Sequence, residues 1–152
     1  MKTTTNLFRK SKILLFLFFL SLSLSAQEDI TGLWRGYNTQ EAADTYSSKY
    51  DFEMYLKQDG NQIWGRSYAY IGELYAAMEI RGTWDGTQLI FEEVKIVDAK
   101  ANEGMEWCIK KGTLTLLKEG KNHQLEGVWS GNTTFSSCTP GKVFLKKIKP
   151  RA

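Results

Sequence analysis

The chain has 152 residues, of which 42 % are hydrophobic and 13 % aromatic. This is enough for one domain with a packed core, and it excludes a globally disordered chain. The net charge of +3 arises in residues 1–26, which carry four basic residues and no acidic one. Residues 27–152 hold the other 16 basic residues against 17 acidic ones, so nucleic-acid binding has no electrostatic support.

Residues 1–26 have the three-part layout of a secretory signal peptide. A basic start runs to Lys12, an apolar run of 12 residues covers 13–24, and the small residue Ala26 precedes Gln27. The run is shorter than the roughly 20 residues that span a bilayer, although an uncleaved anchor remains the alternative. The sequence therefore predicts a secreted or periplasmic domain at residues 27–152 without a stable membrane anchor.

Residues 27–152 show short runs of alternating apolar and polar residues, separated by turns that contain glycine. This pattern is typical of an all-β barrel or sandwich. We predict an eight-stranded antiparallel up-and-down β-barrel, with a β-sandwich as the alternative. The expected strands are 31–37, 49–58, 61–70, 75–84, 87–97, 105–118, 123–134 and 142–149.

Two hairpins can be registered from Asp-Gly pairs, which favour two-residue turns. Asp59-Gly60 and Asp85-Gly86 are taken as these turns. Each register then places apolar side chains on one face and polar or aromatic side chains on the other. The pairs nearest the turns are Gln58 with Asn61 and Trp84 with Thr87.

The expected loops differ in length between the two ends of the barrel. Connections at 59–60, 85–86 and 119–122 are tight, whereas those at 38–48, 71–74, 98–104 and 135–141 are longer. Because alternate connections of a meander lie at the same end, one end is closed and the other carries the long loops. Trp34, Trp84 and Trp129, which share a Φ-x-Gly-x-Trp-x-Gly repeat, are expected near the closed end as a floor.

Two cysteines, Cys108 and Cys138, both fall at the long-loop end. An even pair in an oxidising compartment predicts a disulfide, with two free thiols as the alternative. A zinc site is not expected, because two cysteines and His123 at wide spacing match no ligand pattern.

The opening Gly32-Leu33-Trp34 of an eight-stranded meander resembles the calycin group of barrels, meaning lipocalins, fatty-acid-binding proteins and avidins. The resemblance implies a closed barrel with a ligand-binding interior. The avidin biotin site does not carry over. Its Gly-x-Tyr-x-Ser stretch reads Gly65-Arg66-Ser67-Tyr68-Ala69 here, so both polar positions differ.

A small barrel is either filled by its own side chains or holds one small ligand. Trp107 is expected near the long-loop end, where it would line a pocket for a small, mostly apolar molecule together with Phe52, Ser67, Ala69, Met78 and Ile109. Tyr46 in the 38–48 loop would act as a lid, and the alternative is that this loop is only a mobile connection. The alternative is that these residues only fill the core.

Glu93 is expected either to point inward opposite Met78 or to be turned to solvent by a bulge near Glu92-Glu93. An inward carboxylate would need a partner.

Four aromatic residues are expected on the outer face, namely Tyr55, Trp64, Tyr68 and Tyr70. An exposed aromatic stripe marks an interface. The alternative function is therefore an interaction module, in which a solid barrel binds protein or carbohydrate through these residues, and the same face could form a homo-oligomer.

No nucleophile–base set or carboxylate dyad can be placed in the sequence. We therefore expect a binding protein rather than an enzyme, with no cofactor and no metal.

Overall fold

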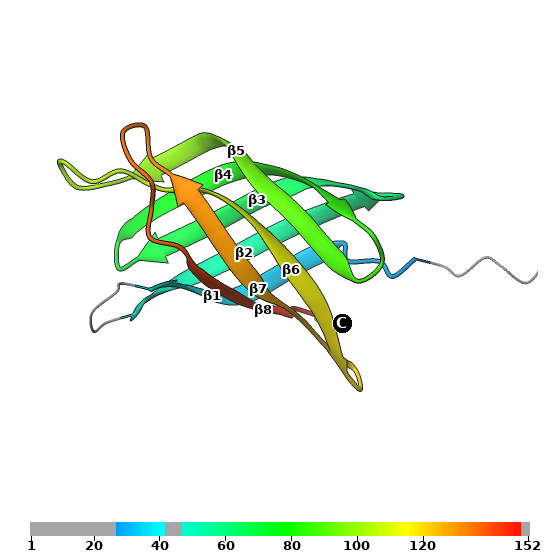
Figure 1. The fold of residues 1–152 in the computed structure, drawn as a ribbon. Helices are drawn as coiled ribbons and strands as arrows, with labels where there is room; N and C mark the ends of the chain where they lie inside the picture. Colours follow the sequence, from blue (N-terminus) through cyan, green and yellow to red (C-terminus); the bar gives the residue numbers. More distant parts are fainter. Residues whose placement is uncertain (1–26, 42–46, 150–152) are drawn as a thin grey trace, which may run out of the picture.

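The computed structural model describes residues 27–41 and 47–149, which form a closed antiparallel barrel of eight strands (Figure 1). Each strand pairs with the next, and β8 pairs with β1. This confirms the predicted up-and-down barrel over the sandwich. The strands are β1 (Gly32–Glu41), β2 (Ser47–Asp59), β3 (Gln62–Ile71), β4 (Leu74–Trp84), β5 (Gln88–Lys100), β6 (Ile109–Glu119), β7 (Asn122–Asn132) and β8 (Gly141–Lys147).

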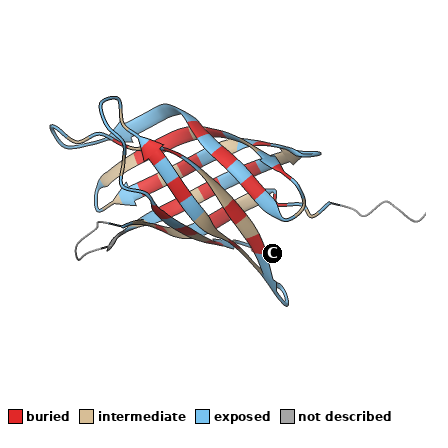
Figure 2. Cartoon of the chain, in the orientation of Figure 1, coloured by how far each residue is buried: buried red, intermediate tan, exposed pale blue. Residues whose placement is uncertain are grey.

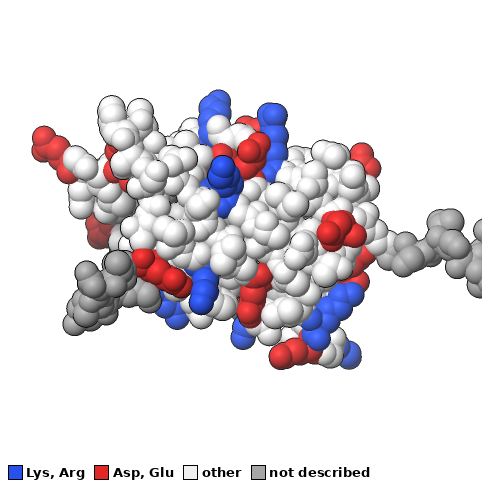
Figure 3. Space-filling model, in the orientation of Figure 1, with Lys and Arg blue, Asp and Glu red and all other residues white. Residues whose placement is uncertain are grey.

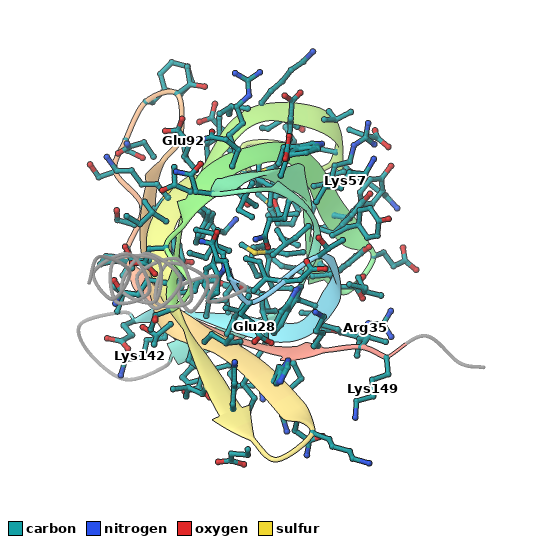
Figure 4. All side chains as sticks on the ribbon, turned by 90° about the vertical axis from the view of Figure 1, so that its right-hand side faces the viewer. Glu28, Arg35, Lys57, Glu92, Lys142 and Lys149 are labelled. Carbon is teal, nitrogen blue, oxygen red and sulfur yellow. A yellow bond between two sulfur atoms is a disulfide. The ribbon has the colours of Figure 1, made fainter. Side chains whose placement is uncertain are left out.

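Alternation along the strands separates the core from the surface, as the banding in Figure 2 shows. On β2, Phe52, Met54 and Leu56 are fully buried, while Glu53 and Tyr55 face outward. Viewed along the barrel, side chains fill the ring of strands (Figure 4). Acidic and basic side chains are interspersed over the face shown in Figure 3. The sequence pattern alone therefore sorts inward from outward side chains in β2.

Glycines at inward positions let neighbouring strands approach closely. A Cβ at Gly65 would overlap the carbonyl oxygen of Tyr55, and one at Gly127 would overlap the carbonyl oxygen of Thr113. Such glycine positions allow the strong bending that closes a narrow barrel.

The β2–β3 hairpin turns at Gly60-Asn61, because Asp59 pairs with Gln62. Gly60 has a φ of 57°, and glycine at the first central position is typical of a type II′ turn. The predicted register of this hairpin was wrong by two positions, since the turn begins one residue later than Asp59-Gly60. The faces are unchanged because a shift of two preserves the alternation.

Two other connections also differ from the prediction, the one between β3 and β4 and the one between β4 and β5. Ile71 pairs with Leu74, so this connection is a two-residue turn and not a longer loop. Trp84 pairs with Leu89 and not with Thr87. The Asp85 carboxylate accepts hydrogen bonds from the backbone N–H groups of Thr87 and Gln88 at 2.8 and 2.7 Å, which widens the turn and lowers the pKa of Asp85.

Strand β5 separates from its neighbour β6 after Glu92 and then carries two bulges against β4. Its pairing with β4 skips Val94 and Val97, one and four residues beyond the bulge predicted at Glu92-Glu93. Its pairing with β6 covers only 88–92 against 111–115. Beyond residue 92, the described chain therefore needs contacts other than a backbone ladder to hold β5 against β6.

The closed end is sealed by the segment that precedes β1, where Glu28 lies (Figure 4). Ile30 is fully buried, and its carbonyl accepts a 2.8 Å hydrogen bond from Trp34 Nε1. Trp84 Nε1 donates to the Glu28 carbonyl, also at 2.8 Å. Trp34 and Trp84 therefore form a floor at the predicted end. Within the described residues, no helix has the length and apolarity needed to cross a membrane.

Trp129 lies at the opposite end from the one predicted. Strand β7 begins at the tight turn after Glu119 and runs toward the long loops, so that Trp129, near its end, reaches Thr39. The repeat shared by the three tryptophans therefore does not place them at one end. Trp34 lies near the start of β1 and Trp84 at the end of β4, both at the closed end, whereas Trp129 lies in the second half of β7, which runs away from that end.

Candidate ligand site

A disulfide joins Cys108 and Cys138 at the long-loop end, with a Cα–Cα distance of 6.2 Å, as predicted. The loop before β8 is further held by a bridge between Asn132 and Ser137 and by a hydrogen bond from the Cys138 N–H to the Gly131 carbonyl. The disulfide thus ties this loop to the segment that enters β6.

Beside the disulfide lies a cavity of about 110 Å³. It is bounded by the ends of β1, β2, β3 and β7 and by the segment that leads into β6. Its lining mixes apolar side chains with amides and a cation: Asn38, Gln40, Tyr50, Ala69, Ile71, Met105, Glu106, Trp107, Cys108, Lys110 and Trp129.

Two indoles form much of the apolar wall. Trp107 and Trp129 are 8 % and 3 % exposed. Trp107 Nε1 donates to the Lys100 carbonyl at 3.2 Å, and Trp129 Nε1 donates to the Thr39 carbonyl at 2.8 Å. Since both N–H groups already have backbone acceptors, the indoles can offer a ligand only their carbon surface.

A buried ion pair lies behind this wall, formed by Glu93 and Lys110, each 4 % exposed. Glu93 Oε1 accepts from the Ser67 hydroxyl at 2.6 Å, and Oε2 accepts from the Lys110 backbone N–H at 2.7 Å. The Lys110 ammonium is 3.5 Å from the same Oε2. Glu93 faces inward opposite Ile80 rather than Met78.

The ammonium of Lys110 sits among aromatic rings and carbonyl groups. It donates to the Cys108 carbonyl at 3.1 Å and lies 5.5 Å and 5.6 Å from the ring centroids of Phe52 and Trp129. Cation–π attraction at such distances helps to stabilise a desolvated charge. Lys110 therefore brings a positive charge into the wall of the cavity.

Asn38 is the second buried polar residue of the wall, with 1 % exposure. Its Oδ1 has no hydrogen-bond partner among the described residues. A buried carbonyl oxygen without a donor carries a desolvation cost. Nearby, the Tyr50 hydroxyl donates to Gln40 Oε1 at 3.3 Å, so polar groups cluster on this side of the cavity.

The residues predicted for the pocket are only partly brought together. Trp107 and Ala69 line the cavity. Phe52, Ser67 and Met78 are buried in the core and lie outside the cavity lining. Phe52 contacts the Lys110 ammonium and Ser67 binds Glu93. Tyr46 lies outside the described residues.

The placement of Ile109 in the pocket was wrong, because its side chain is 38 % exposed and Lys110 faces inward instead. The error arises before the strand begins. Residues 105–108 are irregular and β6 starts at Ile109, so alternation counted from Trp107 loses its phase.

Sequence reasoning missed Lys110 and Asn38. One signal existed for the first, because Lys110 and Lys111 are consecutive and one of two neighbours in a strand must face inward. Asn38 was assigned to a loop, but β1 and β2 remain paired as far as Glu41 and Ser47.

A larger hollow of about 860 Å³ lies on the outer surface of β4 to β7. Its floor includes Gly82 and Gly112, and its apolar side chains Ile90 and Val128 are 56 % and 60 % exposed. This open surface contrasts with the inner cavity, where the polar residues Asn38 and Lys110 are buried.

The outer aromatic residues face solvent as expected. Tyr55, Trp64 and Tyr70 are 47 %, 43 % and 36 % exposed, and Tyr68 is half-buried.

In the described part of the chain, no group of three His, Cys, Asp or Glu side chains is placed to hold a metal ion. The whole chain matches no protein-family model and no curated protein.

Proposed function

We propose that this protein is a secreted or periplasmic barrel that binds one small ligand in the cavity between Trp107 and Trp129. The observation that carries the proposal is the buried Glu93–Lys110 pair at the cavity wall. Burying two charges costs more solvation energy than filling the same space with apolar side chains. A buried ion pair beside a cavity therefore supports a ligand-binding role for these residues rather than a role in core packing alone.

The size of the cavity limits the ligand. A volume of about 110 Å³ equals the liquid volume of roughly three to four water molecules. It accommodates a compact molecule and has no room for a long acyl chain. The mixed wall favours a ligand with an apolar body and at least one polar group, rather than the mostly apolar ligand expected from the sequence.

Two further observations support the cellular context and the type of function. The Cys108–Cys138 disulfide is compatible with an oxidising compartment. His123, the one histidine of the sequence, lies 3.7 Å from Glu28 at the closed end, away from the cavity. We infer that the barrel binds its ligand without converting it.

Native mass spectrometry of the protein, purified from the oxidising compartment of its host, tests this proposal. We expect a small co-purifying mass. Ala69→Phe fills the cavity, since Ala69 lines it at 4 % exposure, and should abolish this mass. Ala99→Phe, at an exposed position of β5, is the matched control and should retain it. A mass without ligand, in a protein that also binds no added small molecule, would refute the proposal.

The outer aromatic face supports a second candidate, an interaction module. Tyr55 and Trp64 expose large apolar surface on neighbouring strands, which is a composition found at interfaces. Under this alternative, Trp64→Ala leaves the fold intact and removes self-association or partner binding. An unchanged sedimentation mass and unchanged partner capture would count against it.

A further inference from the structure

The ammonium of Lys110 has capacity for one more acceptor. It carries three N–H donors. Its contacts are the Cys108 carbonyl at 3.1 Å and Glu93 Oε2 at 3.5 Å, and the second distance exceeds the usual range of a hydrogen bond. Because Lys110 also lines the cavity, a ligand oxygen can complete its hydrogen bonding.

The charges around the cavity favour an uncharged ligand. Glu93 already balances Lys110 inside the barrel, and Glu106 adds a negative charge on the exposed side of the lining. A bound anion would place a second carboxylate beside a single buried cation. A bound cation would meet Lys110 at short range. Either arrangement leaves an uncompensated charge in a poorly solvated space.

Asn38 supplies the complementary polar group. Its side-chain amide is buried in the cavity wall, and Oδ1 lacks a donor among the described residues. An N–H or O–H group of a ligand would meet this need, and an apolar molecule would leave it unmet.

We propose, on the basis of the binding role above, that the cavity recognises a small uncharged molecule that bears an amide or a similar paired acceptor and donor. The carbonyl oxygen of the ligand accepts from Lys110 Nζ, and its N–H donates to the amide of Asn38. The remaining few carbon atoms pack against the indoles of Trp107 and Trp129, whose own N–H groups are engaged with the backbone.

Titration of the purified protein with four probes of similar size tests this inference. The probes are propionamide, propionate, propylammonium and cyclopentane, and the indole N–H signals of Trp107 and Trp129 in NMR spectra report occupancy. We expect propionamide to bind at least about tenfold more tightly than each of the other three. Asn38→Leu should remove this preference while cyclopentane binding is retained or improved.

Lys110→Met combined with Glu93→Gln removes both buried charges together and should also weaken propionamide binding. Lys111→Met, at the exposed neighbouring position, is the matched control and should leave all four affinities unchanged. The ranking of probes on the unaltered protein decides the question even if a variant does not fold.

The outcomes separate the two proposals. Tighter binding of cyclopentane, propionate or propylammonium at these indoles overturns the amide inference and leaves small-ligand binding in place. If no probe shifts the indole signals, the amide inference is wrong. If, in addition, no cargo is found by mass spectrometry, so that the cavity holds water alone, the binding function is wrong as well.

Discussion

The carboxylate of Glu93 accepts the backbone N–H of Lys110 at 2.7 Å and lies 3.5 Å from the ammonium of the same residue. This contact lies one residue beyond the last backbone pair between β5 and β6. A side-chain carboxylate thus takes the place of a backbone carbonyl where the two strands part. The same contact introduces a buried charge pair next to the cavity.

Removing one member of this pair should destabilise the protein strongly. Lys110→Met leaves Glu93 buried without its cation, and breaking a buried pair in this way costs about 3–5 kcal/mol. The free energy of unfolding, measured by urea titration, checks this value. Adding Glu93→Gln should restore most of the loss, because the amide oxygen can accept the backbone N–H of residue 110 while the amide NH2 donates to the Ser67 hydroxyl, which can act as an acceptor.

Lys111→Met is the control for that measurement. Its side chain is exposed, and changes at such surface positions usually stay within about 0.5 kcal/mol. A loss in Lys111→Met as large as in Lys110→Met would show that burial of the charge is not the cause.

Trp107→Ala should weaken ligand binding more than it lowers stability. The indole lines the cavity, is 8 % exposed and packs next to the disulfide segment. Truncation removes a wall of the site and enlarges a space that is already partly unfilled. Ligand affinity and urea unfolding are measured in parallel. A change that only destabilises the protein would identify Trp107 as a core residue.

Replacing both cysteines by serine should lower stability by about 3–4 kcal/mol, from the entropy of closing a loop of this length. The bond links positions 30 residues apart. The loss should be matched by adding a reductant to the unaltered protein, and the reductant should have no effect on the double variant. Equal unfolding midpoints with and without reductant in the unaltered protein would contradict this prediction.

The closed end should lose stability in acid. The hydrogen bond from Lys118 at 2.6 Å, with the nearby positive charges, holds the pKa of Glu28 below its ordinary value. Because the folded pKa is the lower one, this stabilisation is present above the unfolded pKa of about 4.3 and is lost as the pH falls through the folded pKa.

Glu28→Gln tests this linkage. The variant should be less stable than the unaltered protein at pH 7, and the difference in urea midpoint should narrow below about pH 4. Glu119→Gln serves as the comparison, because Glu119 is an exposed acid of the β6–β7 hairpin, which also carries the Glu28 partner Lys118. A difference for Glu28→Gln that is constant across this pH range would rule out the proposed role of its charge.

Gly127→Ala should destabilise the barrel by about 2–3 kcal/mol, in the range of overpacking substitutions. The added Cβ would overlap the Thr113 carbonyl oxygen of the paired strand. Gly120→Ala is a useful contrast, because its surroundings are open but its φ of 59° is unfavourable for alanine. Urea unfolding of both variants checks this prediction. A smaller loss of unfolding free energy for Gly127→Ala than for Gly120→Ala would show that the paired strands can move apart at low energetic cost.

Much of the fold could be predicted from the sequence because alternation is a local property. Phe52, Met54 and Leu56 occur at every second position, so one face is apolar whatever the strand pairs with. The register in which neighbouring strands pair was harder to predict from the sequence. The turn at Gly60-Asn61 differs from the predicted one by a single residue, and this difference moves each cross-strand pair by two positions.

The candidate site depended on tertiary structure. Trp107 and the pairing of Cys108 with Cys138 could be inferred, since the order of strands alone brings them to the long-loop end. Lys110 could not, because the irregular residues 105–108 break the alternation before β6. Its charge is compensated inside the barrel by the Glu93 carboxylate, which lies 3.5 Å from the ammonium where β5 and β6 diverge. Local pattern therefore determined which side chains form the barrel, whereas closure of the barrel decided which polar groups it encloses, since their partners are distant in the chain.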